Sequence, residues 1–259
     1  MAALALLCAC QPKLVIIHTN DTHSHFEPLR GGERDGMGGA IERAAFVDSV
    51  RARYGEDRVL LVHAGDFSQG SSYFTVLKGE VETAVSNAMR YDCMTLGNHE
   101  FDNGVEALRR RIAQMQSPVV CANIDLSAVG LDSLIAPHLI INKGGKKIGI
   151  IGLEAPLEQN VSHSISQLIP ELDPVESVRT QTELLKAEGC DMIIVLSHRG
   201  YEEDQELAAA TSGVDLFIGG HTHTFVDGFK YVRNSSGRRV PIITDGCWGL
   251  EMGEVKVWR

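Results

Sequence analysis

The chain has 259 residues, of which 44% are hydrophobic and 22% are charged, and its formal net charge is −10. This length and composition are ordinary for one globular domain. The negative charge argues against nucleic acid as the main partner. It suits a phosphate substrate only where bound divalent cations reverse the local field.

The chain begins with a short apolar segment, MAALALLCAC, which is far too short to span a bilayer. It resembles the end of a secretory signal, and LCAC resembles a bacterial lipobox in which Cys10 would be lipidated. We therefore expect residues 1–12 to be a signal or lipobox remnant, or a disordered terminus, and residues 13–259 to form one domain. The lipid anchor would place the protein in the periplasm or at a membrane of a bacterial cell envelope.

Hydrophobic runs and helical periodicity alternate along the chain. They predict strands over residues 13–19, 58–64, 92–97, 118–124, 192–198 and 214–220. They predict helices over residues 38–55, 80–91, 104–115, 174–188 and 202–211. Residues 138–153 read as a hairpin around KGGK, and residues 238–246 and 253–259 read as an antiparallel pair. This order predicts an α/β fold with one mixed sheet or two packed sheets.

Five of the predicted strands end in side chains of the kinds that bind metals. These are Asp21 and His23 in NDTHSH, Asp66 in GDFSQG, Asn98 in GNHEFD, His198 in SHRG, and His221 and His223 in GGHTH. A single cluster of this kind is more often a solvated turn or a helix cap. Five of them indicate one site, because a sheet brings the carboxyl ends of its strands together.

The ligand types are carboxylate, imidazole and amide, which suit Zn²⁺, Mn²⁺, Fe or Co²⁺. No CxxC pair occurs, and Cys93, Cys121 and Cys190 lie in apolar runs that predict buried thiols. Seven ligands are too many for one ion, so we expect two ions that share one carboxylate. Paired ions are a standard device for the hydrolysis of phosphate esters. In an extended DTHSH segment His23 and His25 point the same way, so the pattern leaves open which of them binds.

The motifs NDTHSHF, GDFSQG, TLGNHEFDNG, SHRG and GGHTHT resemble, in this order, those of the calcineurin-like metallophosphoesterases, over nearly the whole chain from about Lys13. The bacterial 5′-nucleotidase and 2′,3′-cyclic phosphodiesterase group is the most similar. The resemblance implies a four-layer α-β-β-α sandwich with two mixed β-sheets. It implies one ion held by Asp21, His23, Asp66 and His223, a second held by Asp66, Asn98, His198 and His221, and a catalytic dyad of His99 and Asp102.

The function that this resemblance implies is a phosphoesterase with two divalent metal ions, acting on nucleotides as a 5′-nucleotidase-like phosphomonoesterase. A broad-specificity phosphodiesterase and a 2′,3′-cyclic nucleotide phosphodiesterase are alternatives. Hydrolysis of a sulfur-containing ester is a further one, and a non-catalytic, metal-binding module of the cell envelope is an alternative of another class. Most members of the family carry a C-terminal domain that binds the nucleobase. We therefore expect a separate subunit to supply that domain, unless the chain is self-sufficient or has been shortened.

Overall fold

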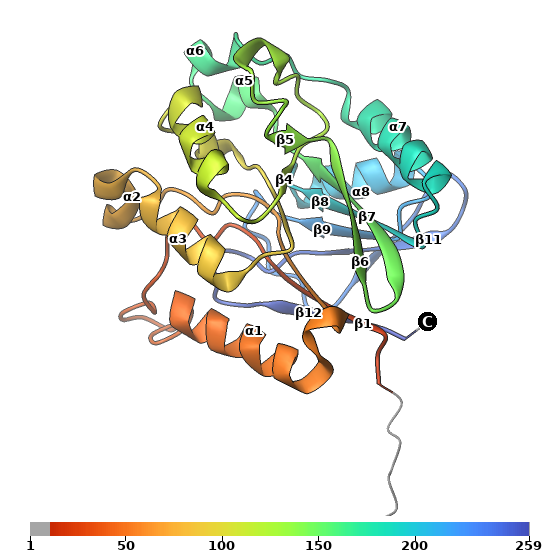
Figure 1. Ribbon diagram of the computed structural model, residues 1–259, viewed down its shortest axis with the longest axis horizontal. Coiled ribbons are helices and arrows are strands. Elements are labelled where there is room, and N and C mark those ends of the chain that lie inside the picture. The colour runs from red at the N-terminus through yellow and green to blue at the C-terminus, as the bar shows by residue number, and fades with distance from the viewer. Residues whose placement is uncertain (1–10, 259) are drawn as a thin grey trace, which may run out of the picture.

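The computed structural model describes residues 11–258 of the chain, and Cys10 lies outside the described residues. The lipid anchor on Cys10 therefore stays a prediction. Within the described part, no helix combines the length and the apolar character needed to cross a bilayer. Figure 1 shows two sheets with helices packed on their outer faces.

The first sheet has the strand order β12-β1-β2-β3-β4-β5. Its members are β1 (Leu14–Thr19), β2 (Val59–His63), β3 (Cys93–Thr95), β4 (Val119–Val120), β5 (Ile135–Ala136) and β12 (Gly253–Val257). Strands β1 to β5 run parallel, and β12 pairs with β1 in the antiparallel sense. The parallel strands therefore end at one common edge.

The second sheet has the strand order β10-β11-β9-β8-β7-β6. Its members are β6 (His138–Lys143), β7 (Lys146–Leu153), β8 (Met192–Ser197), β9 (Leu216–Gly219), β10 (Lys230–Arg233) and β11 (Arg239–Ile243). Strands β7, β8, β9 and β11 are parallel, whereas β6 and β10 are antiparallel to their neighbours. Both sheets are thus mixed.

Helices cover the outer face of each sheet (Figure 1). On the first sheet lie α1 (Ala40–Tyr54), α3 (Glu80–Met89) and α4 (Val105–Gln114), and on the second lie α7 (Pro174–Ala187) and α8 (Tyr201–Ala210). Asp173 caps α7, because its side chain accepts a hydrogen bond of 2.9 Å from the backbone of Glu176. The short helices are η1 (Glu56–Arg58), α2 (Ser72–Leu77), η2 (Asn98–Phe101), η3 (Ser127–Val129), α5 (Leu157–Asn160) and α6 (His163–Ser166).

The hydrophobic core has three layers, which follow from the alternation of side chains along the strands. In β1, Leu14 and Ile16 belong to the layer between the two sheets, whereas Val15 and Ile17 belong to the layer under the helices of the first sheet. A third layer joins the second sheet to α7 and α8 through residues such as Val178. These layers confirm the predicted four-layer sandwich.

The predicted hairpin over residues 138–153 is confirmed by the antiparallel pairing of β6 with β7. The predicted antiparallel pair of residues 238–246 with 253–259 is wrong, because β11 belongs to the second sheet and β12 to the first. The strand that pairs with β11 in the antiparallel sense is β10, which the sequence pattern did not indicate. Residues 244–252 therefore cross from one sheet to the other. We call them the crossing segment.

Candidate metal centre

The seven predicted ligands lie at the carboxyl ends of strands from both sheets. Asp21 and His23 follow β1, Asp66 follows β2 and Asn98 follows β3, while His198 follows β8 and His221 and His223 follow β9. Six of them fall into tight groups whose candidate ligand atoms lie within 4.8 Å of one another. The groups are Asp21, His23 and His223; His23, Asp66 and His99; and Asp66, His198 and His221.

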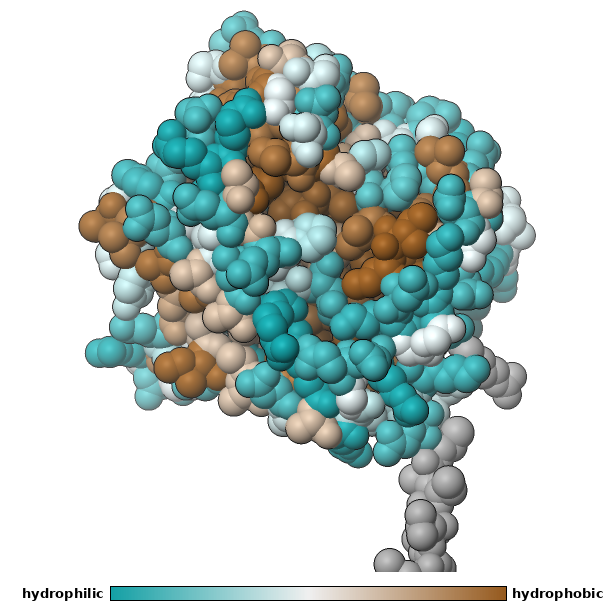
Figure 2. Space-filling view, viewed as in Figure 1, coloured by the Kyte–Doolittle hydropathy of each residue, from teal (hydrophilic) through white to brown (hydrophobic). Residues whose placement is uncertain are grey.

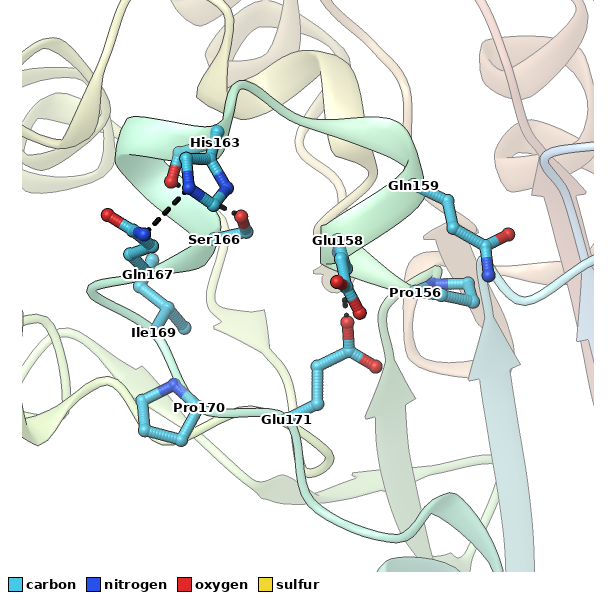
Figure 3. A pocket seen from close by; sticks show the side chains of 9 residues that line it. All are labelled: Pro156, Glu158, Gln159, His163, Ser166, Gln167, Ile169, Pro170 and Glu171. Atoms are coloured by element: carbon cyan, nitrogen blue, oxygen red, sulfur yellow. Dashed lines mark hydrogen bonds between the residues drawn. The ribbon is translucent and has the colours of Figure 1, made fainter.

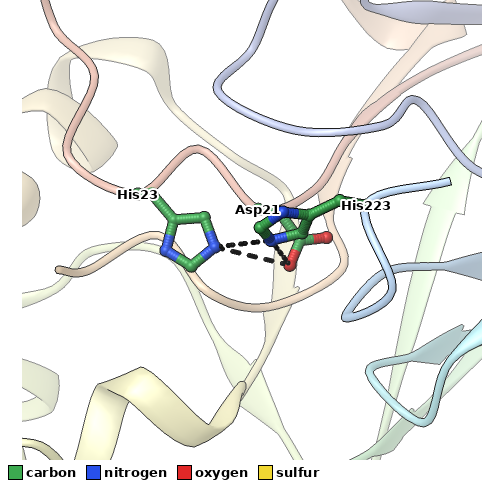
Figure 4. Close-up of side chains that lie close together, drawn as sticks. All are labelled: Asp21, His23 and His223. Carbon is green, nitrogen blue, oxygen red and sulfur yellow. Dashed lines mark hydrogen bonds and ion pairs between the residues drawn. The ribbon is translucent and has the colours of Figure 1, made fainter. Parts of the chain in front are cut away.

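The first group joins the end of β1 to the end of β9, as Figure 4 shows. The Nε2 atoms of His23 and His223 are 2.9 Å apart. The Oδ1 atom of Asp21 lies 3.4 Å from Nε2 of His223 and 3.7 Å from Nε2 of His23. Two imidazole nitrogens and a carboxylate oxygen therefore converge on one point.

Asp66 connects this first group to the group that contains His198 and His221. Its Oδ2 atom lies 3.7 Å from Nε2 of His23 and 3.0 Å from Nε2 of His198. The Nδ1 atom of His198 lies 2.8 Å from the carbonyl oxygen of Ala64, to which it donates, so Nε2 is the atom left for a cation. Asp66 thus lies between imidazoles from both sheets, and its Oδ2 atom is the carboxylate oxygen closest to Nε2 of His198 in the described part of the chain.

Asn98 is buried on the same side, with 5% of its surface exposed. Its Oδ1 atom has no hydrogen-bond partner among the described residues. A buried polar atom without a partner is costly, and a cation would satisfy it. The donor set of carboxylate, imidazole and amide therefore fits a pair of divalent cations.

The glycines of the motifs allow this close packing. A side chain at position 97 would place its Cβ 2.3 Å from Oδ1 of Asp66, and one at position 65 would place it 2.5 Å from Nδ1 of His198. Neither distance is tolerable, so Gly65 and Gly97 are needed where the loops pass the ligands.

The charges of the group favour a bound cation. Burial alone would lower the pKa of His198, but the carboxylates of Asp66 and Asp21 outweigh it and hold that pKa well above its ordinary value. Contacts with Asp21 and then with Cys247 raise the pKa of His223 to about 10. Both shifts reflect a concentrated negative charge, which a divalent cation would neutralise.

His99 and Asp102 lie together at the edge of the centre. Nδ1 of His99 is 2.9 Å from Oδ2 of Asp102, and both side chains are about one-third exposed. The backbone N–H of His99 donates to Oδ1 of Asp66 over 3.0 Å. The hydrogen bond with Asp102 raises the pKa of His99. This geometry suits the catalytic dyad that the family resemblance implies.

His25, which the sequence left as an alternative to His23, lies outside these groups. Its Nδ1 atom lies 2.9 Å from the carbonyl oxygen of His23. Two further histidines, His18 in β1 and His63 in β2, are fully buried. His18 pairs with Asp245 at 2.7 Å, and Nε2 of His63 lies 3.1 Å from the hydroxyl of Thr22.

Glu100 was not predicted from the sequence, and it supports the loops that carry the ligands. Its carboxylate accepts hydrogen bonds from the backbone of Asp66, Ser68 and Gly97, at 2.9, 3.0 and 2.7 Å. It is fully buried. Its place inside the GNHEFD motif was the available signal, because the residue after two site residues at a strand end is well placed to tie the loops together.

Other hollows of the molecule lie apart from the centre. A cavity of about 390 Å³ opens on the segment after β7 and is lined by residues such as Glu158, His163 and Glu171 (Figure 3). Figure 2 shows a largely hydrophilic face with hydrophobic hollows near β5 and beside β6. A cavity of about 320 Å³ next to β5 is lined by residues such as Ile124 and Ile135. None of the predicted site residues lines either cavity.

The comparisons with known proteins agree with this geometry. Residues 14–225 match the model of the calcineurin-like phosphoesterases. The chain belongs to this family. The match includes all seven predicted ligands and both members of the dyad, so the family assignment covers the whole centre.

Several relatives of the chain are 5′-nucleotidases. It is 34% identical to the snake venom 5′-nucleotidase of Crotalus adamanteus over 95% of this chain and 45% of that protein. It is 38% identical to a probable 5′-nucleotidase of Treponema pallidum over 82% of this chain and 37% of that protein. The solved 5′-nucleotidase precursor of Thermus thermophilus superposes with a TM-score of 0.87 at 35% identity, over 93% of this chain and 50% of that one. The chain thus spans about half the length of these relatives or less.

Proposed function

We propose that this chain hydrolyses phosphate esters, and nucleoside monophosphates in particular, with two divalent cations. The observation that carries the proposal is the position of Asp66, whose carboxylate lies between imidazoles of both sheets and beside the His99–Asp102 pair. One ion would be held by Asp21, His23, Asp66 and His223, and the other by Asp66, Asn98, His198 and His221. Zn²⁺, Mn²⁺, Fe and Co²⁺ all suit this donor set.

Bound cations of this kind lower the pKa of water to give a nucleophile and neutralise the phosphate oxygens. The chain's own residues do the rest. Ala64 fixes the ring of His198 through its Nδ1 atom. Asp102 accepts from Nδ1 of His99, which leaves Nε2 as the atom that would donate to the leaving oxygen of the ester.

The nucleotide preference rests on the relatives, several of which are named 5′-nucleotidases. A separate subunit that completes the nucleobase site is part of the proposal. The lipid anchor on Cys10 and the location in a bacterial cell envelope are proposed from the sequence alone.

The test is a substrate screen of the chain reconstituted with Mn²⁺, Zn²⁺ or Co²⁺. AMP, 2′,3′-cyclic AMP and bis(p-nitrophenyl) phosphate are assayed in parallel, with and without the product of a neighbouring gene. We expect AMP to have the highest kcat/KM, and a completing subunit to raise it. A preference for either diester would favour the phosphodiesterase alternatives. No turnover of any ester by the fully metallated chain would overturn the proposal in favour of a non-catalytic metal-binding module.

A further inference from the structure

A groove with aromatic walls lies on one flank of the sandwich, where β10 and β12 are the edge strands of the two sheets. Its volume is about 390 Å³. Phe229, Tyr231 and Trp258 line it and are 40%, 46% and 50% exposed. Apolar residues such as Pro241 and Val255 line it as well. Three exposed aromatic side chains gathered in one groove are typical of a surface that binds a partner.

The surface around this groove carries positive charge that no acidic side chain neutralises. Lys13, Arg233 and Arg239 are exposed, and they belong to no ion pair within residues 11–258. The guanidinium of Arg239 lies over the ring of Tyr231, 4.3 Å from its centroid. Because the chain as a whole has a net charge of −10, this flank differs from the average surface and is complementary to an anionic partner.

The carboxylates on the same elements are already paired. Asp215, the acidic residue among those that line the groove, is bound by the guanidinium of Arg238. In β12, Oε1 of Glu254 lies 2.9 Å from Nζ of Lys256. These two acidic side chains therefore do little to repel an anionic surface.

The first residues of the chain join the molecule beside this groove. The backbone N–H of Lys13 donates to the carbonyl oxygen of Val257 over 2.8 Å. Residues 1–10 are all hydrophobic, and two residues separate them from Lys13. The extended chain between Cys10 and Lys13 spans roughly 10 Å. A bilayer that holds the lipid anchor proposed on Cys10 is therefore within reach of the groove.

We propose that this flank is a membrane-docking surface: the three aromatic side chains enter the headgroup region of an anionic bilayer, and the three unpaired cations bind its phosphate groups. Tryptophan and tyrosine are enriched at membrane surfaces, because an apolar ring with a polar group suits that region. Each lysine or arginine near an anionic surface strengthens binding roughly fivefold. The inference goes beyond the proposed hydrolysis and does not depend on it.

Docking in this way sets the direction in which the metal centre faces. Val257 pairs with Leu14 at the start of β1, whereas Asp21 follows the end of β1. At about 3.3 Å per residue, the two ends of this strand lie roughly 20 Å apart. The metal centre would therefore open away from the bilayer, toward soluble substrates.

The first experiment uses the full chain made without acylation, so that the groove is tested apart from the lipid anchor. The chain is sedimented with vesicles of phosphatidylcholine and phosphatidylglycerol, or of phosphatidylcholine alone. We expect W258A to weaken binding to the mixed vesicles about tenfold and Arg239→Gln about fivefold. W248A and Lys78→Gln are the matched controls at exposed residues elsewhere and should bind like the wild type. Wild-type binding by W258A, or equal binding to both vesicles, would overturn the proposal.

The second experiment follows the groove itself. The chain has two tryptophans, so W248F leaves Trp258 as the single fluorescent reporter. We expect the mixed vesicles to shift its emission to the blue, and high salt to reverse the shift. A blue-shifted emission without vesicles would overturn the proposal in favour of another occupant, residues 1–10 or a second copy, which light scattering distinguishes. Hydrolysis of AMP is measured in the same samples, so a chain that docks but does not hydrolyse would contradict the proposed function alone.

Discussion

The two edges of the sheets solve the same problem of chain reversal in different ways. At the edge where the parallel strands end, tight turns fall on residues whose side chains are needed. Ten non-glycine residues of the described part have positive φ, and eight of them lie in the loops of the metal centre: Asp21, His23, Ser24, Asp66, Gln69, His221, His223 and Trp248. At the opposite edge, glycines such as Gly144, Gly145 and Gly189 provide most of the positive φ angles, together with Arg90.

This difference shows where the fold accepts strain. Each left-handed residue other than glycine costs roughly 1–2 kcal/mol, which glycine avoids. At the opposite edge no ligand atom is needed, so glycine is used at most of these turns, and Arg90 is an exception at the end of α3. At the metal centre five of these residues, the predicted ligands Asp21, His23, Asp66, His221 and His223, both turn the chain and present a ligand atom. We therefore expect substitutions at the two edges to differ in kind: activity changes at one and stability changes at the other.

The largest effect is expected at the carboxylate between the two ligand groups. Asp66→Asn should lower kcat for the best ester at least about 10³-fold, because several kcal/mol of transition-state stabilisation depend on the ions it would hold. Elemental analysis should show fewer than two metal ions per chain. Asp191→Asn is the control at the opposite edge, where Asp191 accepts a hydrogen bond of 2.8 Å from the backbone of Lys147. Full activity and metal content in Asp66→Asn would remove Asp66 from the centre.

The next effect tests the dyad. His99→Asn should lower kcat by about 10²-fold or more while both metal ions stay bound, since His99 would act on the leaving oxygen and not as a ligand. Asp102→Asn should have a smaller effect on kcat. His163→Asn, at an exposed histidine, is the control. Wild-type turnover in His99→Asn would exclude His99 from the mechanism, and loss of metal from it would make His99 a ligand.

A smaller effect is expected behind the centre. Glu100→Gln replaces one acceptor oxygen by an NH₂ group that faces the backbone donors of Asp66, Ser68 or Gly97. The loops should loosen, and metal affinity should fall about tenfold to a hundredfold, which competition with a chelator measures. The control is Glu183→Gln on the exposed side of α7. Unchanged affinity would mean that Glu100 only supports the fold.

The pH dependence of stability has a source in α8. Burial raises the pKa of Asp204 from 3.8 to about 7. Between these two values the folded protein binds a proton that the unfolded chain does not, so this residue lowers stability as the pH rises from about 4 to about 7. Asp204→Asn should therefore raise Tm at pH 8 by about 3 °C or more and change it little near pH 4. The same gain at both pH values would refute this origin.

The smallest effect is expected at the groove that Trp258 and Tyr231 line. Tyr231 is 46% exposed, and the guanidinium of Arg239 lies 4.3 Å from its ring centroid. Tyr231→Ala should lower the free energy of unfolding by about 0.5–1 kcal/mol, as measured by urea denaturation, and leave kcat unchanged. A loss of activity would show that this groove and the metal centre are coupled.

Much of the centre could be predicted from the sequence, because its residues come in short motifs directly after apolar strands. Asp21, Asp66 and His198 are examples. Arg43 and Trp248 could not be predicted in this way, and for Arg43 the reason is physical. An arginine in an amphipathic helix normally faces solvent, and only the tertiary packing buries Arg43 under backbone carbonyl groups of the loops at the centre.

The wrong strand pair has a similar cause. Residues 238–246 and 253–259 are close in sequence, and local reasoning joins such strands into a hairpin. The crossing segment is instead held at the end of β1, where Asn20 accepts from the backbone of Asp245 over 2.9 Å and donates to Gly246 over 2.7 Å. Contacts between residues more than two hundred positions apart are not visible in a local pattern.

The crossing segment has a mechanical consequence. It leaves β11 in the second sheet and enters β12 in the first, and on the way the backbone of Trp248 bonds to Asp21. If one sheet slid over the other, the crossing segment would have to stretch, and its hydrogen bonds with Asn20 would have to break. The crossing segment therefore limits how far Asp21, which follows β1 in the first sheet, can move from His223, which follows β9 in the second sheet.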